Sequence, residues 1–382
     1  MKILILSWRG PGHPNEGGAE QVTLEHAKAW INAGHEVFWF TSYHQGAEKV
    51  EICSKVKVIR KAGQTFGVKA VALFWYFFGK HPKFDLVVDQ FHGIPFFTPL
   101  YIRVTKLAFI HETAKEVWKY NPWPKPYNKI PPLIGYFFEP LIFKILYKNI
   151  PFMTVSDSTK DDLVDWGIPK KNITVIHNGV KLYLPKTLPL KNKIKTAIFL
   201  GALAEDKGVF TALKIFQEIN TMEKGWEFWM VGKGAEDIIQ RIDEYAKKYE
   251  IDEKLTLWGY VSDQKKFDLL ARSHILVNPS IHEGWGLVNI EANASGIPVV
   301  AYNVQGLKDS VKDGETGILI KKGNTRLFAQ KVISLVGNKK RYQKFSKNAL
   351  NWSRKFKWDS ATKGSLKLIN KINYHGLKPM VV

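Results

Sequence analysis

Hydrophobic positions in the first half of the chain form short continuous runs separated by amphipathic stretches. The sequence opens on the apolar run KILILSW, passes through a glycine-containing loop at residues 10–18, and continues into AEQVTLEHAKAWINAG. The spacing of apolar residues in that last segment predicts a helix that ends at Gly34. Further apolar runs predict buried strands at residues 35–42, 56–59, 86–88, 107–110 and 153–155. Continuous apolar strands that alternate with helices favour a parallel, doubly wound α/β sheet.

A second unit of the same kind begins near Lys195. Its predicted strands are TAIFLGAL, WEFWMVGKG, LTLWGYV, HILVNPS, IPVVAYN and GILIK, and helices are predicted at Phe210–Met222 and Asp237–Tyr249. The segment from Lys181 to Lys195 has much lysine, proline and leucine but no periodicity, which is typical of a linker. We therefore expect an N-terminal domain at residues 1–178, a linker at 179–194 and a second domain at 195–358.

Length and composition narrow the class of protein. A chain of 382 residues is long enough for two domains, and its single cysteine, Cys53, has no partner for an internal disulfide. The N-terminal run reads as a buried strand, because it continues into a glycine loop without a cleavage-like site. Prolines and charged residues interrupt the apolar stretch from Ile130 to Tyr147, so we expect no helix that spans a membrane.

The formal net charge of +21 predicts attraction to something anionic. The basic residues are dispersed, without zinc-ligand spacing or an RNA-binding signature, so we expect no nucleic acid partner. An anionic membrane surface and general solvation remain as alternative explanations. The segment Lys115–Ile150, rich in aromatic residues and lysines, fits either a membrane-surface anchor or a packed wall of a binding cleft. Its six prolines argue against one continuous amphipathic helix.

The stretch PSIHEGWGLVNIEANASGIPVVA, residues 279–301, contains the strongest chemical signal. Gly284 and Gly286 precede a predicted helix at Leu287–Ser295, and amides at a glycine-opened helix terminus bind phosphate. Glu283 lies in the loop ahead of that anion site, and Glu291 lies about one turn inside the helix. A diphosphate with hydroxyl groups on both sides would suit this arrangement, with a sugar at one carboxylate and a ribose at the other. The pattern therefore points to a nucleotide sugar.

The same stretch resembles the donor-site signature of retaining glycosyltransferases of family 4, also called group 1 glycosyltransferases. The resemblance implies the GT-B fold, with two facing Rossmann-like domains of parallel sheets and a C-terminal helix, here residues 359–382, that crosses back to the first domain. It also implies metal-independent transfer, without a cofactor, from a UDP-, GDP-, ADP- or dTDP-sugar to a glycan or lipid-linked acceptor. It is strongest from Met153 to Leu319 and looser over residues 62–150, where the acceptor should bind.

The resemblance also assigns roles to residues. The implied catalytic residues are His111, Glu283 and Lys207. The implied donor-binding residues are Gly17, Gly18, Gly208, Gly259, Tyr260, Val261, Gly284, Trp285, Gly286, Leu287 and Glu291. His13 and His282 are weaker candidates.

One position departs from the family pattern. The family carries an arginine directly after the glycine of LGALAEDKGV, and this chain has Ala202 there. Arg9 is a candidate for the missing positive charge. The departure also leaves weaker donor binding, a different donor or lost activity open.

We expect a cytoplasmic enzyme of polysaccharide, lipopolysaccharide or other cell-envelope glycan synthesis, peripheral on the inner face of the membrane. Three other classes remain as alternatives. They are a different GT-B enzyme such as an epimerase or phosphorylase, a non-catalytic sugar-nucleotide binder, and a basic adaptor for nucleic acid or membrane.

Overall fold

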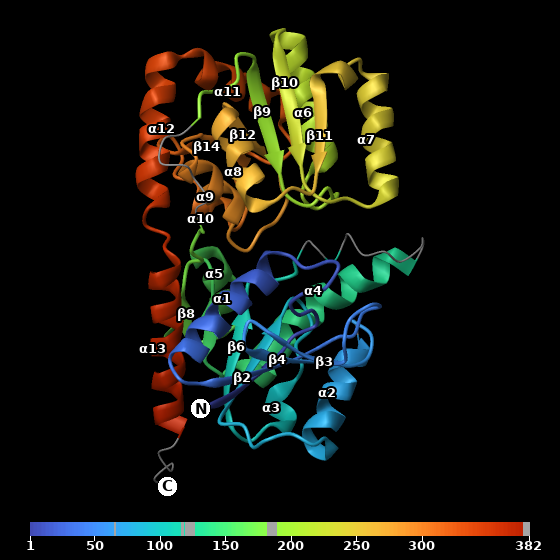
Figure 1. Ribbon diagram of the computed structural model, residues 1–382, viewed down its shortest axis with the longest axis vertical. Coiled ribbons are helices and arrows are strands. Elements are labelled where there is room, and N and C mark those ends of the chain that lie inside the picture. Colours follow the sequence, from blue (N-terminus) through green and yellow to red (C-terminus); the bar gives the residue numbers. More distant parts are fainter. Residues whose placement is uncertain (65, 116–117, 119–126, 182–188, 377–382) are drawn as a thin grey trace. The chain divides into compact units, whose positions relative to one another are not determined.

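The chain forms two α/β units. A computed structural model describes residues 1–64, 66–115, 118, 127–181 and 189–376 (Figure 1). The first unit comprises Met1–Gly179 and Trp358–Val382, and the second comprises Val180–Lys357. The predicted linker lies partly outside the described residues, at 182–188, as does the end of the predicted C-terminal helix, at 377–382. The first unit is therefore built from two separate stretches of sequence.

The first unit contains an eight-stranded sheet in the order β3-β4-β2-β1-β5-β6-β7-β8. All neighbouring strands are parallel except β3, which pairs antiparallel with β4 at the edge. The strands are β1 Lys2–Leu6, β2 Glu36–Thr41, β3 Val50–Cys53, β4 Val56–Arg60, β5 Leu86–Phe91, β6 Thr105–Ile110, β7 Phe152–Thr154 and β8 Ile173–Val175. The short antiparallel β3 was not predicted, because its sequence VEIC alternates and lacks an apolar run.

Helices cover both faces of this sheet (Figure 1). The helices are α1 Gly18–Asn32, α2 Phe66–Phe78, α3 Thr98–Tyr101, α4 Ile130–Ile142, α5 Asp157–Asp165 and α13 Trp358–Gly376, with short helical turns at Tyr127–Lys129, Phe143–Tyr147 and Lys170–Asn172. Helices α1 and α13 pack on each other, and His26 of α1 contacts both Phe109 of β6 and Trp358 of α13. The nitrogen Nε1 of Trp30 donates to Oγ of Ser365 at 3.0 Å, which further joins these two helices.

Two helix starts in the first unit follow from local sequence. The amide of Gly17 donates to Oε2 of Glu20 at 2.8 Å, so a glutamate in the first turn closes the start of α1. Ser156 directly precedes α5. Its hydroxyl accepts from the amide of Thr159 at 3.2 Å and so caps the start of the helix.

The expected interruption of the apolar segment at 130–147 is wrong. Residues Tyr127–Tyr147 form one helical run that is long and apolar enough to cross a membrane, by length and composition only. The sequence argument failed because proline is tolerated in the first turn of a helix, where α4 begins. Pro140 lies inside α4, and the π-helical turn Phe143–Tyr147 follows it closely.

The second unit contains a six-stranded, all-parallel sheet in the order β11-β10-β9-β12-β13-β14. Its strands are β9 Lys195–Leu200, β10 Trp226–Val231, β11 Leu255–Gly259, β12 Ile275–Asn278, β13 Val299–Tyr302 and β14 Gly317–Ile320. Its helices are α6 Val209–Met222, α7 Glu236–Lys248, α8 Asp263–Arg272, α9 Leu287–Ala294, α10 Leu307–Ser310, α11 Thr325–Gly337 and α12 Lys339–Ser353, with a turn at Asp252–Lys254. Every strand predicted for this half is present, and the predicted helices agree with α6, α7 and α9 within a residue at either end.

Two apolar cores hold the second sheet. The larger core joins Phe199, Phe228 and Val300 to buried residues of α6, α7 and α11. The smaller core joins Ile198, Leu276 and Val299 to residues of α8 and α9 on the opposite face. A sheet covered on both faces explains why its strands read as unbroken apolar runs. It also fixes the loops at the carboxyl ends of the strands, where ligands of such sheets bind.

Candidate functional site

The predicted residues of the second unit lie on loops that follow two neighbouring strands, β9 and β12. The loop after β9 contains Lys207 and Gly208, and the loop after β12 contains Glu283 and the glycine turn. The amide of Ile281 donates to the carbonyl of Asp206 at 3.1 Å and joins the loops. A Cβ on Gly208, where φ is +76°, would lie 2.3 Å from the carbonyl oxygen of Pro279. Only glycine permits this approach of the two backbones.

These loops bring together two of the predicted catalytic side chains. Nζ of Lys207 lies 2.9 Å from Oε1 of Glu283, and both side chains remain partly exposed. The charged pair has two consequences. Lys207 is held next to Glu283, and its ammonium still carries the positive charge that an incoming anion needs.

The glycine turn after Glu283 is fixed by steric contacts. Gly286, with φ of +70°, is the residue before α9, and a Cβ there would lie 2.9 Å from Leu307 and Ser310. Trp285 is buried and packs edge-on against Phe356, with ring centroids 5.1 Å apart. The turn that precedes α9 is therefore rigid. The first backbone amides of α9 have no acceptor in a preceding helical turn, and this turn fixes their direction. Such a helix terminus favours anions.

A chain of buried polar side chains supports the same turn from within the fold. Nδ2 of Asn278 donates to Oδ1 of Asn289 at 2.8 Å, and Nδ2 of Asn289 donates to Oγ of Ser310 at 2.9 Å. All three residues are buried. This network fixes the orientation of α9 relative to β12 and α10.

Glu291 meets a residue that the sequence did not indicate. Nζ of Lys266, on α8, lies 2.6 Å from Oε1 of Glu291 and 3.0 Å from Oδ1 of Asp263. Burial raises the pKa of Glu291, and the ammonium of Lys266 opposes that shift. Burial would lower the pKa of Lys266, but the charges of Glu291 and Asp263 outweigh it and raise that pKa. The carboxylate predicted to hold ribose hydroxyls is thus part of an ion pair.

The end of β11 presents the other predicted donor residues. Gly259 ends the strand with φ of +63°, and its carbonyl accepts from the amide of Gly232 at 2.9 Å. Tyr260 follows with 82% of its surface exposed, ahead of Val261. An exposed ring beside a strand end offers a flat apolar surface on which a nucleobase can stack.

The position of Ala202 is exposed, as an arginine there would be. The neighbouring loop after β10 places Lys233 next to it, because the amide of Leu203 donates to the carbonyl of Lys233 at 2.8 Å. Lys233 is exposed and is a candidate for the missing charge that sequence reasoning overlooked. Predicting this role for Lys233 requires the knowledge that β9 pairs with β10, which the sequence alone does not give.

In the first unit, Arg9 braces the predicted glycine loop. Nε of Arg9 lies 3.1 Å from Oε1 of the buried Glu20, and Nη1 of Arg9 donates to the carbonyl of Asn15 at 2.7 Å. Since Glu20 also accepts from the amide of Gly17, one ion pair shapes the backbone at Gly17 and Gly18. Arg9 therefore has a structural task within its own unit.

His111 is a buried, neutral histidine just after β6. Its Nε2 lies 3.5 Å from Oγ1 of Thr23, and its ring packs on Phe109 with centroids 4.3 Å apart. Burial, followed by the charge of His26, lowers the pKa of His111 to about 3. Near neutral pH this imidazole can donate or accept a hydrogen bond but carries no charge.

A second histidine at the same edge escaped the sequence analysis. Nδ1 of His92, after β5, lies 3.3 Å from Oε1 of Glu112, after β6. The His92 ring also stacks on Trp8, with centroids 6.2 Å apart. Both strands end at the same edge because they are parallel neighbours, and that pairing was the missing signal.

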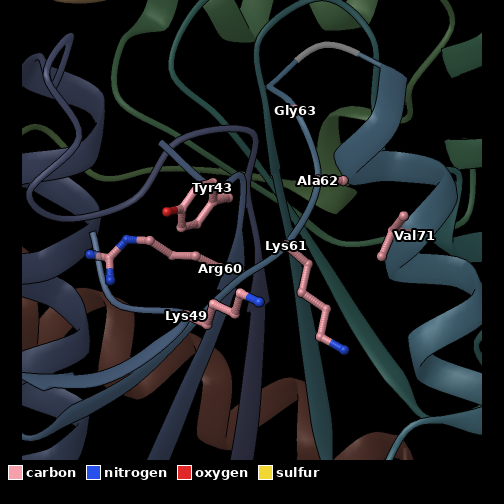
Figure 2. A pocket seen from close by; sticks show the side chains of 7 residues that line it. All are labelled: Tyr43, Lys49, Arg60, Lys61, Ala62, Gly63 and Val71. Atoms are coloured by element: carbon pink, nitrogen blue, oxygen red, sulfur yellow. The ribbon is translucent and has the colours of Figure 1, made fainter. Parts of the chain in front are cut away.

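A basic pocket of about 670 Å³ opens at the carboxyl ends of β2 and β4 (Figure 2). Arg60 at its edge is buried and already donates to Glu51 and to the carbonyl of Pro11, both at 2.6 Å. Lys49 and Lys61 are exposed and add two positive charges. The pocket is lined by Tyr43, Lys49, Arg60, Lys61, Ala62, Gly63 and Val71.

Within the ranges that the structure describes, no group of three or more His, Cys, Asp or Glu side chains is placed to hold a metal ion. Lys207, Lys233 and the amides of α9 are cationic and hydrogen-bonding groups that the second unit offers to an anion.

Two solved structures share this fold over nearly the whole chain. Sucrose-phosphate synthase from Thermosynechococcus elongatus matches with a TM-score of 0.80 at 18% identity, covering 98% of this chain and 99% of that one. HepE from Anabaena, in complex with UDP-glucose, matches with a TM-score of 0.73 at 16% identity, covering 97% and 100%. The two α/β units thus have the GT-B glycosyltransferase fold, as predicted.

Sequence models of known families identify the chain more closely. The model described as Glycosyltransferase Family 4 matches residues 16–183, and the model described as Glycosyl transferases group 1 matches residues 183–352. The chain belongs to the group 1 glycosyltransferases, a family of transferases, and the predicted membership is confirmed.

A curated relative matches about half of the chain. The capsular polysaccharide biosynthesis glycosyltransferase CapM of Staphylococcus aureus is 27% identical over 219 residues, which cover 53% of this chain and 57% of that protein. The chain spans about half the length of the curated relatives it matches.

Proposed function

We propose that the protein transfers a sugar from a nucleotide-sugar donor to a glycan or lipid-linked acceptor, with retention of anomeric configuration and without a metal ion. The observation that carries this proposal is the Lys207–Glu283 ion pair beside the glycine turn that opens α9. The pair and the helix terminus together offer positive charge and amides to a diphosphate, next to a carboxylate for sugar hydroxyls.

The second unit supplies the remaining donor contacts in this proposal. Glu291, oriented by Lys266, accepts hydrogen bonds from ribose hydroxyls, and the exposed ring of Tyr260 stacks on the base. The solved HepE structure holds UDP-glucose, which supports a nucleotide sugar as the class of donor. Lys233 takes the part of the arginine that is absent at residue 202.

The transfer step follows from this charge arrangement. The bond between the anomeric carbon and the phosphate oxygen breaks, and the acceptor oxygen attacks from the same face. A phosphate oxygen of the leaving group takes the acceptor proton, and the nucleoside diphosphate departs. Lys207 and the α9 amides stabilise the charge that develops on the diphosphate, which is usually the largest contribution to catalysis. Glu283 has a positioning role, and His111 contributes a neutral hydrogen-bonding group.

The basic pocket of the first unit supports an acceptor with an anionic group. Lys49 and Lys61 are exposed there, and Arg60 is held by Glu51. Lipid-linked saccharides carry phosphate, which two ammonium groups attract. This feature favours a lipid-linked acceptor over a neutral glycan.

The proposal is tested by donor binding and donor hydrolysis without an acceptor. A thermal-shift screen with UDP-, GDP-, ADP- and dTDP-sugars should find one donor that raises the melting temperature. Lys207→Met should lower hydrolysis of that donor at least about a hundredfold, since one fixed charge is lost at the diphosphate. Glu283→Gln should also lower it.

Glu315→Gln is the matched control, because Glu315 is an exposed carboxylate of the same unit. Unchanged hydrolysis in both site variants would reject the assignment. A sugar nucleotide converted to its epimer, with no transfer, would favour the epimerase alternative instead.

A further inference from the structure

Helix α4 exposes a broad apolar surface. Its outward side chains are between 47% and 68% exposed, although they are large and hydrophobic. They are Leu133, Ile134, Tyr136, Phe137, Phe138 and Leu141, and Ile145 in the following turn belongs with them. A continuous apolar surface of this kind marks an interaction site rather than a solvated helix.

The opposite side of the same helix is fixed to the fold. Oε1 of Glu139 accepts from the amide of Ala114 at 2.9 Å, and its Oε2 accepts from Nε1 of Trp118 at 2.9 Å. Phe143 and Tyr147 are fully buried against the sheet. Although the run Tyr127–Tyr147 is apolar enough to cross a bilayer, this inner side is already occupied. A partner therefore meets the helix along its outer side.

Helices α2 and α3 continue this surface. Phe74, Phe77 and Phe78 project from α2, Leu100 projects from α3, and Phe78 is 82% exposed. The inner sides of α2 and α3 pack on Leu4, Leu6 and Val87.

The strand register shows that all three helices cover one face of the sheet. Val87, Asp89 and Phe91 alternate along β5 and so point to the same face. Val87 lies in the core under α2, Asp89 accepts from Thr98 of α3 and from Tyr147 after α4, and Phe91 packs on Phe143. Figure 1 shows α2, α3 and α4 within this unit. We call their outward sides the apolar face.

The charge around the apolar face is predominantly positive, although Asp85, two residues after Lys83, is an exposed acid. The segments 66–84, 93–106 and 127–148 contain a single acidic residue, Glu139, and it is only 4% exposed. Exposed basic residues lie at the ends of the helices. They are Lys80, Lys83, Arg103, Lys129, Lys144 and Lys148. Aromatic and aliphatic side chains surrounded mainly by basic ones match the boundary between acyl chains and anionic headgroups.

We propose that the apolar face docks on an anionic lipid bilayer. The aromatic and aliphatic side chains of α4 and α2 enter the headgroup boundary, and the surrounding lysines and arginine meet lipid phosphates. The protein lies on the membrane and does not span it, since the inner side of α4 stays on the sheet. This docking needs no donor and does not depend on glycosyl transfer.

Flotation with lipid vesicles tests the proposal on the full chain without ligand. Wild-type protein should bind vesicles of equal parts phosphatidylglycerol and phosphatidylcholine much more tightly than vesicles of phosphatidylcholine alone. The variant Leu133→Ser/Phe137→Ser/Leu141→Ser should reduce binding at least about tenfold, because three buried apolar contacts are lost. Phe74→Ser/Phe77→Ser/Phe78→Ser should do the same if α2 belongs to the face.

Charge reversal tests the basic residues separately. Lys129→Glu/Lys144→Glu/Lys148→Glu should weaken binding to the anionic vesicles by about fivefold or more per residue. The matched control is Lys339→Glu/Lys340→Glu/Lys344→Glu on α12, which changes the net charge equally at exposed positions of the second unit. The control should keep most of the binding. Circular dichroism and thermal melting of each variant establish that the fold is intact.

Several outcomes would overturn the proposal. Wild-type protein that does not float with either vesicle rejects it. Apolar variants that float as well as wild type show adsorption by charge alone. A dimer in light scattering that the apolar variants abolish, without vesicle binding, identifies the face as an interface between copies. Donor binding in the same variants, read by thermal shift, keeps failure of docking separate from failure of the proposed activity.

Discussion

At the scale of single residues, Lys266 shows how a partner changes the chemistry expected of a carboxylate. Glu291 was recognised from the glycine-helix motif, but its partner lies on the preceding helix, at 2.6 Å. Sequence spacing cannot reveal this pair, because the contact depends on α8 and α9 packing against the same sheet. Lys207 and Glu283 were predicted together only because the family resemblance names both. His92 and Glu112 were missed since nothing in the sequence shows which strands are neighbours.

Replacing Lys266 with methionine should both destabilise the fold and weaken donor binding. The change leaves Glu291 in a buried site without its cation, so burial raises the pKa of the carboxyl further. We expect a loss of about 2–3 kcal/mol in the free energy of unfolding and roughly tenfold weaker donor binding, which worsens as the pH falls. Calorimetric titration with the donor at several pH values measures this.

Lys265→Met on the same helix is the control, because that lysine is more exposed and its ion pair is with Asp268, at 3.8 Å, rather than with Glu291. If Lys266→Met binds donor as well as wild type at every pH, Glu291 has no contact with the ribose.

At the scale of elements, the strands of the second unit followed from their apolar runs because both faces of its sheet are covered. The first unit was less predictable. Helix α2 is apolar on its outer side as well as its inner side, so its periodicity is weak, and β3 is too short and polar to stand out. The helix at 130–142 was misjudged because Pro131 and Pro132 were weighed as breakers although they lie in its first turn, where proline is tolerated.

The glycine turn before α9 packs against the loop between β13 and α10, which contains Gly306. The variant Gly306→Ala tests whether this contact matters. A Cβ on Gly306 would lie 2.1 Å from the carbonyl oxygen of Glu283, and φ there is +74°. We expect a loss of more than about 2 kcal/mol in unfolding free energy, together with reduced donor hydrolysis as Glu283 is displaced. Urea denaturation and hydrolysis assays measure the two effects.

Gly314→Ala is a close control, since Gly314 has the same φ of +74° and nothing within 4 Å of the added Cβ. Comparing the two variants separates the cost of a positive φ from the steric clash between the added Cβ and Glu283. Equal losses of activity in both variants would show that the contact with Glu283 is unimportant.

At the scale of the whole molecule, both units contain histidines whose pKa is lowered by burial, which predicts acid sensitivity. Burial lowers the pKa of His26 to about 4, of His111 to about 3 and of His274 to about 4. The unfolded chain binds protons at these groups near pH 6.5, so it takes up more protons than the folded chain as the pH falls. The contribution of these histidines to the free energy of unfolding should therefore be fully present above pH 6.5 and should decrease between pH 6.5 and 3.

His26→Phe should reduce that decline. His26 is almost fully buried among Phe109, Trp30 and Trp358, and an apolar ring there has no proton to gain. Between pH 7 and pH 4, the free energy of unfolding of the variant should fall by up to about 3 kcal/mol less than that of the wild type. Urea denaturation at a series of pH values measures the slope. Parallel pH profiles for wild type and variant would mean that His26 does not titrate on unfolding.

The place of α13 in the first unit has a consequence for the newborn chain. A ribosome delivers residues 1–179 first, yet the surface around Trp30 and His26 is covered only by residues that begin at Trp358. The whole second unit emerges in the interval. Residues 1–179 are thus made before the segment that completes their unit, and until residues 358–376 are made the apolar surface of α1 stays uncovered and open to aggregation.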